Sequence, residues 1–336
     1  MLVDAYQRPI KDLRISVTDR CNFRCSYCMP LDHYEWIDKK EILTFEEITR
    51  FAKLAIELGV EKIRLTGGEP LVRQDLPLLI EKLAALEGLH DLCLTTNGAL
   101  LGERVQALKQ AGLRRVNISI DTLDAEKFKQ MTKRGDLDKV LEGIFAAKDA
   151  GLAPIKLNAV VERGVNDDDI IPLVEFSREH GFAMRFIEYM DVGNSNNWTS
   201  AKLVSKKEII EKIHSRYALR EIGRDQGSAP SVDYEFADGR GDIGVIASVT
   251  EPFCGSCTRL RLTADGKIVT CLFSQLGHDV KGLMRGGATD EEVRTFLSSI
   301  WQKRTDRYSD ERLTALNSAS YYPKNHRKIE MISLGG

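Results

Sequence analysis

The sequence predicts an α/β fold: an incomplete (βα)6 TIM-like barrel with a mixed α+β C-terminal region covering its open side. Short β-branched runs alternate with helical patterns from Leu13 to about Met190, which is typical of βα units and a parallel sheet. Six units fall short of the eight that close a full barrel, and a doubly wound sheet is the alternative. Because the alternation stops after about Asn194, we expect two domains, residues 1–193 and residues 194–336.

Six segments have the composition of buried parallel strands. They are Leu13–Thr18, Lys62–Thr66, Leu92–Thr95, Arg115–Ile120, Pro154–Val161 and Phe182–Glu188. Apolar residues recur at helical spacing between them, for example in Thr44–Leu58 and Gln74–Leu86. The C-terminal region is expected to begin with a helix over Ser205–His214 and to continue in short segments rich in turn residues.

The composition indicates a globular protein without a strong overall charge. The chain has 336 residues, 43% of them hydrophobic, and its 48 basic and 50 acidic residues give a formal net charge of -2. This balance does not favour binding to nucleic acid or to an anionic membrane. The sequence shows neither a signal peptide nor an apolar run of about twenty residues, so we expect a cytoplasmic protein without a membrane segment.

Polar side chains recur at every second position of several predicted strands. They are Arg14, Ser16 and Thr18; Lys62, Arg64 and Thr66; Thr95 and Asn97; Asn117, Ser119 and Asp121; and Lys156 and Asn158. Strands wrapped by helices have no solvent face, so we interpret these side chains as a polar barrel lumen. Together with Arg185, the basic members predict a local cationic cavity suited to a polyphosphate or a carboxylate.

The first of two cysteine groups follows the first predicted strand. Cys21, Cys25 and Cys28 form a CxxxCxxC motif, and close spacing lets one loop supply three thiolates to an iron–sulfur cluster. Three ligands leave one iron open, as sites that bind a substrate or cofactor do. The alternative is a zinc site completed by His33.

The second group lies near the other end of the chain. Cys254, Cys257 and Cys271 again supply three thiolates, and a zinc site with His278 as fourth ligand is the alternative. Cys93 lies inside a predicted strand and is expected to be a small buried hydrophobe. The odd total of seven cysteines argues against a disulfide framework.

The CxxxCxxC motif and the Gly67-Gly68-Glu69-Pro70 segment after the second strand together resemble the radical SAM superfamily, whose members use S-adenosylmethionine (SAM). In that superfamily the open iron of a [4Fe-4S] cluster chelates the amino and carboxylate groups of SAM. The resemblance implies that the first cysteine group holds this cluster. The residues implied to contact SAM are Tyr27, Gly68, Ser119 and Met190.

Further segments resemble one branch of the superfamily over essentially the whole chain, the GTP 3′,8-cyclases of molybdenum cofactor biosynthesis. These segments are residues 18–30, 185–193 and 253–262 and the terminal Gly335-Gly336. The resemblance implies a second [4Fe-4S] cluster on Cys254, Cys257 and Cys271, whose open iron contacts guanine. The residues implied to bind GTP are Arg14, Arg64, Thr95, Lys156, Arg259, Leu260 and Arg261. A catalytic role is implied for Arg259, Arg261, Gly335 and Gly336, the glycines forming a tail that reaches the active site.

The family reaction begins with cleavage of SAM to a 5′-deoxyadenosyl radical, which abstracts hydrogen from C3′ of GTP. The carbon radical attacks C8, and the product is (8S)-3′,8-cyclo-7,8-dihydroguanosine 5′-triphosphate, formed in the first step of molybdopterin biosynthesis. The resemblance also implies an electron donor such as a flavodoxin, a downstream cyclic pyranopterin monophosphate synthase, and a homodimer. Two alternatives stay open: a radical SAM peptide maturase with an auxiliary cluster, and an iron–sulfur or zinc module that senses redox state without turnover.

Overall fold

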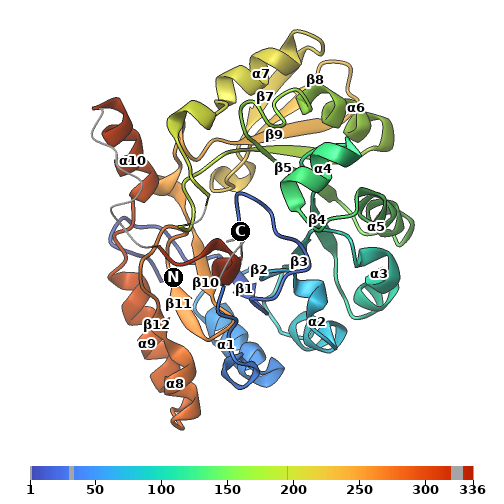
Figure 1. Ribbon diagram of the computed structural model, residues 1–336. Helices are drawn as coiled ribbons and strands as arrows, with labels where there is room; N and C mark the ends of the chain where they lie inside the picture. Colours follow the sequence, from blue (N-terminus) through green and yellow to red (C-terminus); the bar gives the residue numbers. More distant parts are fainter. Residues whose placement is uncertain (1, 30–33, 195, 319–327, 336) are drawn as a thin grey trace.

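A single mixed sheet runs through the molecule (Figure 1). The computed structural model describes residues 2–29, 34–194, 196–318 and 328–335. In spatial order the sheet contains β12 (His278–Asp279), β11 (Lys267–Val269), β10 (Arg259–Leu262), β1 (Asp12–Ser16), β2 (Lys62–Thr66), β3 (Asp91–Thr96), β4 (Arg115–Ser119), β5 (Ile155–Val161), β6 (Ala183–Glu188), β9 (Asp242–Ile246), β8 (Val232–Phe236) and β7 (Leu219–Gly223). The predicted α/β class is therefore confirmed.

The central part of the sheet is parallel. Strands β10, β1, β2, β3, β4, β5, β6 and β9 all pair in parallel, whereas β11, β12, β8 and β7 add antiparallel pairs at the two edges. Each of the six predicted strands begins and ends within two residues of the observed strand. The two edge strands do not pair with each other in the described residues, so the sheet is open.

Helices follow the strands in the predicted alternation. They are α1 (Phe45–Glu57), α2 (Leu76–Ala84), α3 (Leu101–Gln110), α4 (Ala125–Thr132), α5 (Leu137–Asp149), α6 (Ile170–His180) and α7 (Lys206–His214). Short 3₁₀ turns are η1 (Lys39–Glu41), η2 (Pro70–Val72), η3 (Ser200–Lys202), η4 (Asp225–Gly227) and η5 (Cys254–Ser256). Helix α1 shows why these segments are helical: Thr44 and Glu47 form a reciprocal capping box, and one apolar face, including Ile48 and Phe51, is buried.

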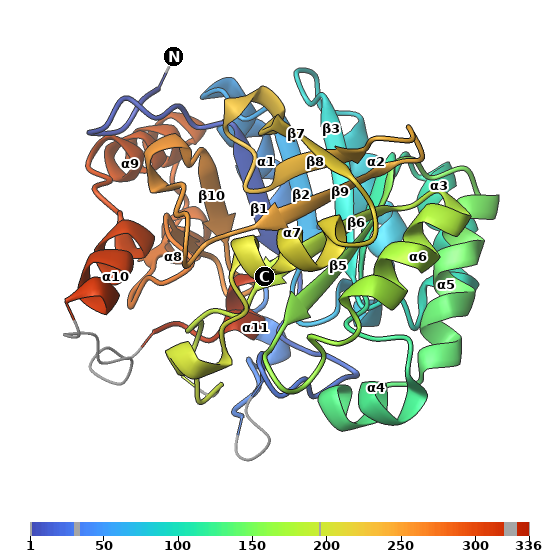
Figure 2. The same cartoon turned by 90° about the horizontal axis from the view of Figure 1, so that it is seen from above.

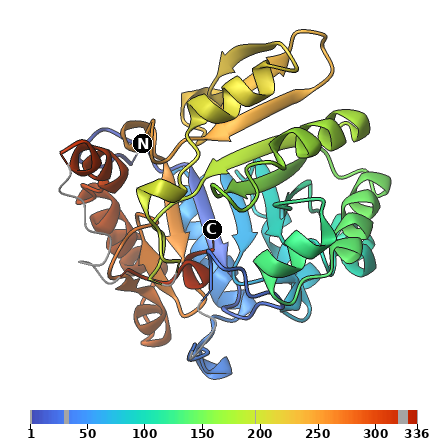
Figure 3. The same ribbon diagram turned by 45° about the horizontal axis from the view of Figure 1, so that its top comes forward.

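The C-terminal region extends the sheet on both sides. Strands β7, β8 and β9 join it beside β6, and β10, β11 and β12 join it beside β1. In Figure 3, α7 and its strands (yellow to light orange) lie on one side of the molecule. The remaining helices, α8 (Val280–Arg285), α9 (Asp290–Gln302) and α10 (Tyr308–Asn317), lie beside β10 (Figure 2). The sequence did not predict this division, because it gives no sign of which strands pair.

The sheet separates an apolar face from a polar one. In β1, Leu13 and Ile15 are fully buried in the hydrophobic core, while the alternate Arg14 is half-buried. Helix α11 (Met331–Leu334) lies on the inner side of the curved sheet, inside the ring of outer helices (Figure 1). Within the described residues, no helix combines the length and apolar composition needed to cross a membrane.

Helices α3 and α5 pack closely because Gly143 of α5 lies directly against Gly98 and Leu101, where α3 begins. A Cβ atom at Gly143 of α5 would overlap the carbonyl oxygen of Gly98, which follows β3. We expect Gly143→Ala to lower the free energy of unfolding by about 1–3 kcal/mol, since overpacking displaces the helix. The matched control is Gly102→Ala in α3, where the new Cβ meets only the flexible carboxylate of Glu142 at 3.3 Å. Denaturant unfolding should find Gly102→Ala neutral or stabilised by up to about 1 kcal/mol; equal destabilisation of the two variants would contradict the close approach.

Candidate active site

Four arginines, which we call the arginine group, lie on one face of β10, β1 and β2. The register places Arg261 beside Arg14 and Arg14 beside Arg64, so these three side chains are neighbours across three strands. Arg259 lies two residues before Arg261 on β10, on the same face. Leu260 between them is fully buried in the hydrophobic core, so it can face a ligand only through its main chain.

The arginine group has no ion-pair partner in the described part of the chain. The nearby basic residues Lys11 and Lys62 are paired with carboxylates, at 3.7 and 3.5 Å, but the four arginines are not. Buried nitrogens of Arg259 (Nε) and Arg261 (Nε and Nη1) have no hydrogen-bond partner among the described residues. Burial, followed by the charges of the other three arginines, lowers the pKa of Arg14 well below its ordinary value. Such uncompensated positive charge is expected where an anion binds.

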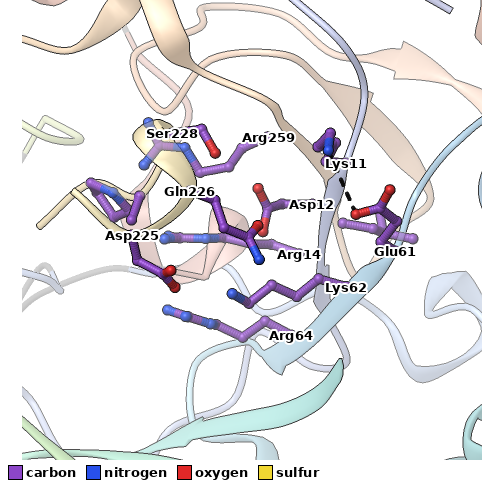
Figure 4. A pocket seen from close by; sticks show the side chains of 13 residues that line it. Lys11, Asp12, Arg14, Glu61, Lys62, Arg64, Asp225, Gln226, Ser228 and Arg259 are labelled. Atoms are coloured by element: carbon purple, nitrogen blue, oxygen red, sulfur yellow. Dashed lines mark ion pairs between the residues drawn. The ribbon is translucent and has the colours of Figure 1, made fainter. Parts of the chain in front are cut away.

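Figure 4 shows the pocket into which part of this group points. Arg14, Arg64 and Arg259 line it together with Lys62 and the segment 225–230, which includes η4. Asp225 of that segment faces the same pocket but forms no ion pair with these residues. Lys11, Asp12 and Glu61 also line the pocket, so its basic side chains outnumber its acidic ones, but Lys156 and Arg185 of the predicted cationic cavity do not line it.

The first cysteine cavity lies where β1 to β6 end. It is lined by Cys21, Cys25 and Cys28 together with Tyr27, Thr66, Gly67, Gly68, Glu69, Thr95, Ser119, Asp121 and Met331, among others. Three of the four residues predicted to contact SAM, Tyr27, Gly68 and Ser119, thus meet at the cysteines. Burial raises the pKa of Cys21 to about 11 and that of Cys28 to about 12, so in this loop thiolates require a positively charged metal partner.

The donor set of this cavity fits an iron–sulfur cluster. The three cysteines lie in one loop, are not in disulfides and face one cavity. No three His, Cys, Asp or Glu side chains of the described residues converge as ligands of a single metal ion. The cysteines of a cluster bind different irons and need not converge on one point. The zinc alternative through His33 lies outside the described residues.

Main-chain hydrogen bonds connect the Gly67-Gly68-Glu69-Pro70 segment to the residues that precede the cysteine loop. The main-chain nitrogens of Gly68 and Glu69 donate to the carbonyl oxygens of Thr18 and Arg20, both at 2.7 Å. A Cβ at position 68 would overlap Arg20 O, so only glycine permits this contact. The two motifs recognised in the sequence therefore form one structural unit.

The carboxylate of Glu69 organises the next turn of this unit. It is 1% exposed and accepts hydrogen bonds from Leu71 N (3.0 Å), Thr96 Oγ1 (2.7 Å) and Asn97 N (2.7 Å). Burial nevertheless raises the pKa of Glu69 to about 7. Glu69 thus ties the ends of β2 and β3 to the floor of the first cysteine cavity.

The second cysteine cavity is lined by Cys254, Cys257 and Cys271, with Arg259, Arg261 and Met190. Although burial raises the pKa of Cys257, the charges of Arg259 and Arg304 outweigh it and bring the value to about 6. The neighbouring arginines therefore favour the thiolate form of Cys257, whereas burial in the first cavity favours the neutral thiols of Cys21 and Cys28. His278, the ligand of the zinc alternative, lies exposed on β12 and does not line the cavity.

Arg259 connects the pocket of Figure 4 with the second cysteine cavity, because it lines both. Met190, predicted to contact SAM, lines the second cavity rather than the first. Tyr27, which lines the first cavity, packs on the same small apolar cluster as Met190.

The described C-terminal segment, residues 328–335, contacts the loop after Cys271 and also lines the first cysteine cavity. Ile329 N donates to the carbonyl oxygen of Ser274 at 3.0 Å, in the loop that follows Cys271, and Met331 lines the first cavity. Gly335 packs so closely on Thr66 of β2 that a Cβ there would overlap the threonine side chain. Gly336 lies outside the described residues.

The remaining predicted residues are more dispersed. Thr95 lines the first cysteine cavity, and its hydroxyl is buried without a hydrogen-bond partner in the described residues. Lys156 is half-buried on β5, and burial followed by the charges of Arg185 and Arg115 lowers its pKa. Arg185 is not the free cation that the sequence suggested, because it pairs with Asp233 and Asp242 at 3.1 and 2.7 Å. Cys93 is fully buried, as expected.

Comparison with known proteins identifies the family. The radical SAM superfamily matches residues 15–177, and the family described as Molybdenum Cofactor Synthesis C matches residues 182–310. The GTP 3′,8-cyclase of Acidothermus cellulolyticus is 48% identical over 99% of this chain and 98% of its own length. Those of Xanthomonas axonopodis pv. citri and Staphylococcus aureus are 44% and 45% identical over 99% of this chain and 98% of theirs. This chain belongs to the GTP 3′,8-cyclase family.

Membership of this radical SAM family implies an iron–sulfur cluster and SAM as cofactors of the enzyme. Among solved structures, Streptococcus suis SuiB bound to SAM aligns with a TM-score of 0.64 over 91% of this chain and 68% of SuiB. The sequences are 17% identical, so this likeness concerns the fold alone.

Several functional neighbours were not predicted from the sequence. Arg304 reaches Cys257 from beyond the end of α9, and Arg8 donates to the carbonyl oxygen of Cys254 at 2.7 Å. Lys328 anchors the tail to Asp191 at 2.6 Å. These residues lie outside strands of the sheet, where no period-two pattern marks them.

Glu69 gives a pH-dependent prediction. Its raised pKa means that, between about pH 4.5 and 7, the native state holds a proton that the unfolded state has lost. The contribution to stability is complete below about pH 4.5 and is lost as the pH rises through about 7. We expect the unfolding free energy of the wild type, minus that of Glu69→Gln, to fall by about 3 kcal/mol over this range.

Denaturant unfolding of the iron-free proteins from pH 4 to pH 8 measures this difference. The control is Glu126→Gln on the surface of α4, whose carboxylate is exposed rather than buried, so the same fall of about 3 kcal/mol is not expected. A difference that rises with pH would mean that the three hydrogen-bond donors, rather than burial, dominate the pKa of Glu69.

Proposed function

We propose that this chain converts GTP to (8S)-3′,8-cyclo-7,8-dihydroguanosine 5′-triphosphate, as the radical SAM GTP 3′,8-cyclase of molybdenum cofactor biosynthesis. Nearly full-length relatives of that name support the assignment. The observation that carries it is the arginine group, four arginines without ion pairs in the described residues, two of which line the second cysteine cavity. A triphosphate supplies the missing negative charge.

The first cysteine cavity is the proposed SAM site. Cys21, Cys25 and Cys28 hold a [4Fe-4S] cluster there, with Tyr27, Gly68, Ser119 and Met190 around SAM. Bound together, this cluster and SAM supply a 5′-deoxyadenosyl radical that removes hydrogen from the substrate. The protein orients the ligands: Gly68 allows close approach of the main chain, and Tyr27 is held by its hydrogen bond to Asp121 at 2.7 Å.

The arginine group and the second cavity form the proposed substrate site. Arg14, Arg64, Arg259 and Arg261 grip the nucleotide, with Thr95, Lys156 and the main chain of Leu260 as further contacts. Cys254, Cys257 and Cys271 hold a second [4Fe-4S] cluster that contacts guanine. Arg259, Arg261 and the tail glycines Gly335 and Gly336 complete the catalytic set. Fixing the triphosphate at one end positions the ribose without placing a charged group at the reacting carbon.

The finer architecture and partners are part of the same proposal. Strands β1 to β6 constitute an incomplete (βα)6 barrel, and residues 1–193 and 194–336 act as two units that share one sheet. The enzyme works in the cytoplasm as a homodimer. A flavodoxin-like donor supplies electrons, and a cyclic pyranopterin monophosphate synthase consumes the product.

A peptide maturase is the other candidate. This alternative is supported by the fold that the chain shares with SuiB. The structure of SuiB bound to a precursor peptide aligns with this chain at a TM-score of 0.62 and 16% sequence identity. A peptide does not account for the arginine group, and the named relatives favour GTP.

Anaerobic reconstitution with iron and sulfide, followed by reductant, SAM and GTP, tests the cyclase. We expect 5′-deoxyadenosine and a cyclised nucleotide, detected by mass spectrometry, at about eight irons per chain. Formation of 5′-deoxyadenosine at about four irons per chain, with GTP unchanged, would point to peptide substrates and remove the cyclase assignment.

The arginine group gives a sharper prediction. Arg259→Ala and Arg261→Ala should leave SAM cleavage largely intact but lower product per 5′-deoxyadenosine by about tenfold or more, since each hydrogen bond to a charged group is worth about 1.5–3 kcal/mol. The matched control is Arg163→Ala, which removes a surface pair with Glu208 and hydrogen bonds to the carbonyl oxygen of Leu203; Arg163 lines neither cysteine cavity. Loss of SAM cleavage with unchanged coupling to product would count against the substrate site.

A further inference from the structure

The sulfur of Cys257 accepts hydrogen bonds from two guanidinium groups, those of Arg304 and Arg259. Nη2 of Arg304 donates to Cys257 Sγ at 3.1 Å, and Nη1 donates to the carbonyl oxygen of the same residue at 2.7 Å. Nη2 of Arg259 donates to the sulfur at 3.3 Å. Arg259 also lines the pocket of Figure 4, whereas Arg304 does not. The contact of Arg304 with the sulfur is therefore independent of any anion in that pocket.

Arg304 is held rigidly in this orientation. Its side chain is about 2% exposed and lies within ion-pair distance of Asp4 (3.5 Å) and Asp306 (3.3 Å). The guanidinium stacks over the ring of Trp301, with 4.7 Å between its central carbon and the ring centroid. Trp301 is itself fully buried and donates to the carbonyl oxygen of Arg8 at 3.1 Å. The N-terminal segment and α9 thus fix Arg304 before any cofactor binds.

The three cysteines of the second cavity are not equivalent. In the described residues, Arg8 approaches Cys254 through its carbonyl oxygen, not its sulfur. Only Cys257 combines a buried sulfur with two donated hydrogen bonds from arginine.

We propose that Arg304 is a positioning residue that orients the Cys257 thiolate and raises the reduction potential of the second iron–sulfur cluster. This inference rests on the second cluster of the proposed function. Reduction adds negative charge to a cluster, so a cation that donates a hydrogen bond to a ligand sulfur favours the reduced state. Arg304 provides this bias permanently, while Arg259 remains able to engage the substrate.

A redox titration of the full-length reconstituted enzyme, followed by electron paramagnetic resonance, tests the proposal. The wild type should show two transitions, one for each cluster. Arg304→Gln should move one of them to lower potential and leave the other in place as an internal reference. Arg304→Lys, which keeps the charge but loses the planar fork, should give a smaller shift. The control is Arg220→Gln on β7, whose exposed side chain pairs with Glu235 of β8, and it should move neither transition.

Iron retention separates positioning from a merely structural role. Orienting residues of this kind are worth about 10–100-fold in metal affinity, so a chelator should remove about half of the iron from Arg304→Gln correspondingly faster. Unchanged potentials in Arg304→Gln, with or without loss of iron, overturn the proposal. A single transition in a wild type that still forms the cyclised nucleotide overturns it too, while leaving the cyclase function intact.

Discussion

Uncompensated positive charge on β10, β1 and β2 is the constraint on which the rest of the site depends. The parallel register holds Arg261, Arg14 and Arg64 side by side, and like charges on adjacent strands oppose one another. The protein offers these arginines no carboxylate within ion-pair distance in its described residues, although nearby Lys62 has one. An anion that binds to these arginines offsets their mutual repulsion. A ligand with more negative charge offsets more of it, so the pocket favours highly charged anions.

The same pairing of β10 with β1 joins the two distant cysteine groups to one frame. Cys257 directly precedes β10 and Cys21 follows the parallel strand β1, so the two groups lie at opposite ends of this strand pair, with Arg14, Arg259 and Arg261 between them. The Gly68 main chain, bonded to Thr18 O, adds β2 to this frame. The tail, held through Ile329 to Ser274, closes the remaining side. The main chain thereby connects the proposed SAM site with the proposed nucleotide site.

Much of this arrangement was predictable because strand side chains alternate. Period-two polarity in β1 and β2 correctly indicated that Arg14 and Arg64 share a face, and the six strand positions follow from the same pattern. Pairing between distant segments leaves no local signal. The neutralisation of Arg185 by Asp233 and Asp242 depends on β8 and β9 joining β6, and the contact of Arg304 with Cys257 depends on the packing of α9. Local pattern therefore predicts which residues face the lumen, and tertiary pairing decides which of them remain charged and free.

The central claim is that the arginine group holds GTP with its ribose at the radical source of the first cysteine cavity. Incubating the reconstituted enzyme with SAM, reductant and GTP carrying deuterium at C3′ tests this most directly. We expect mass spectrometry to find deuterium in 5′-deoxyadenosine, together with loss of that deuterium from the cyclised nucleotide. Unlabelled 5′-deoxyadenosine, or a product that keeps the label at C3′, would contradict the claim.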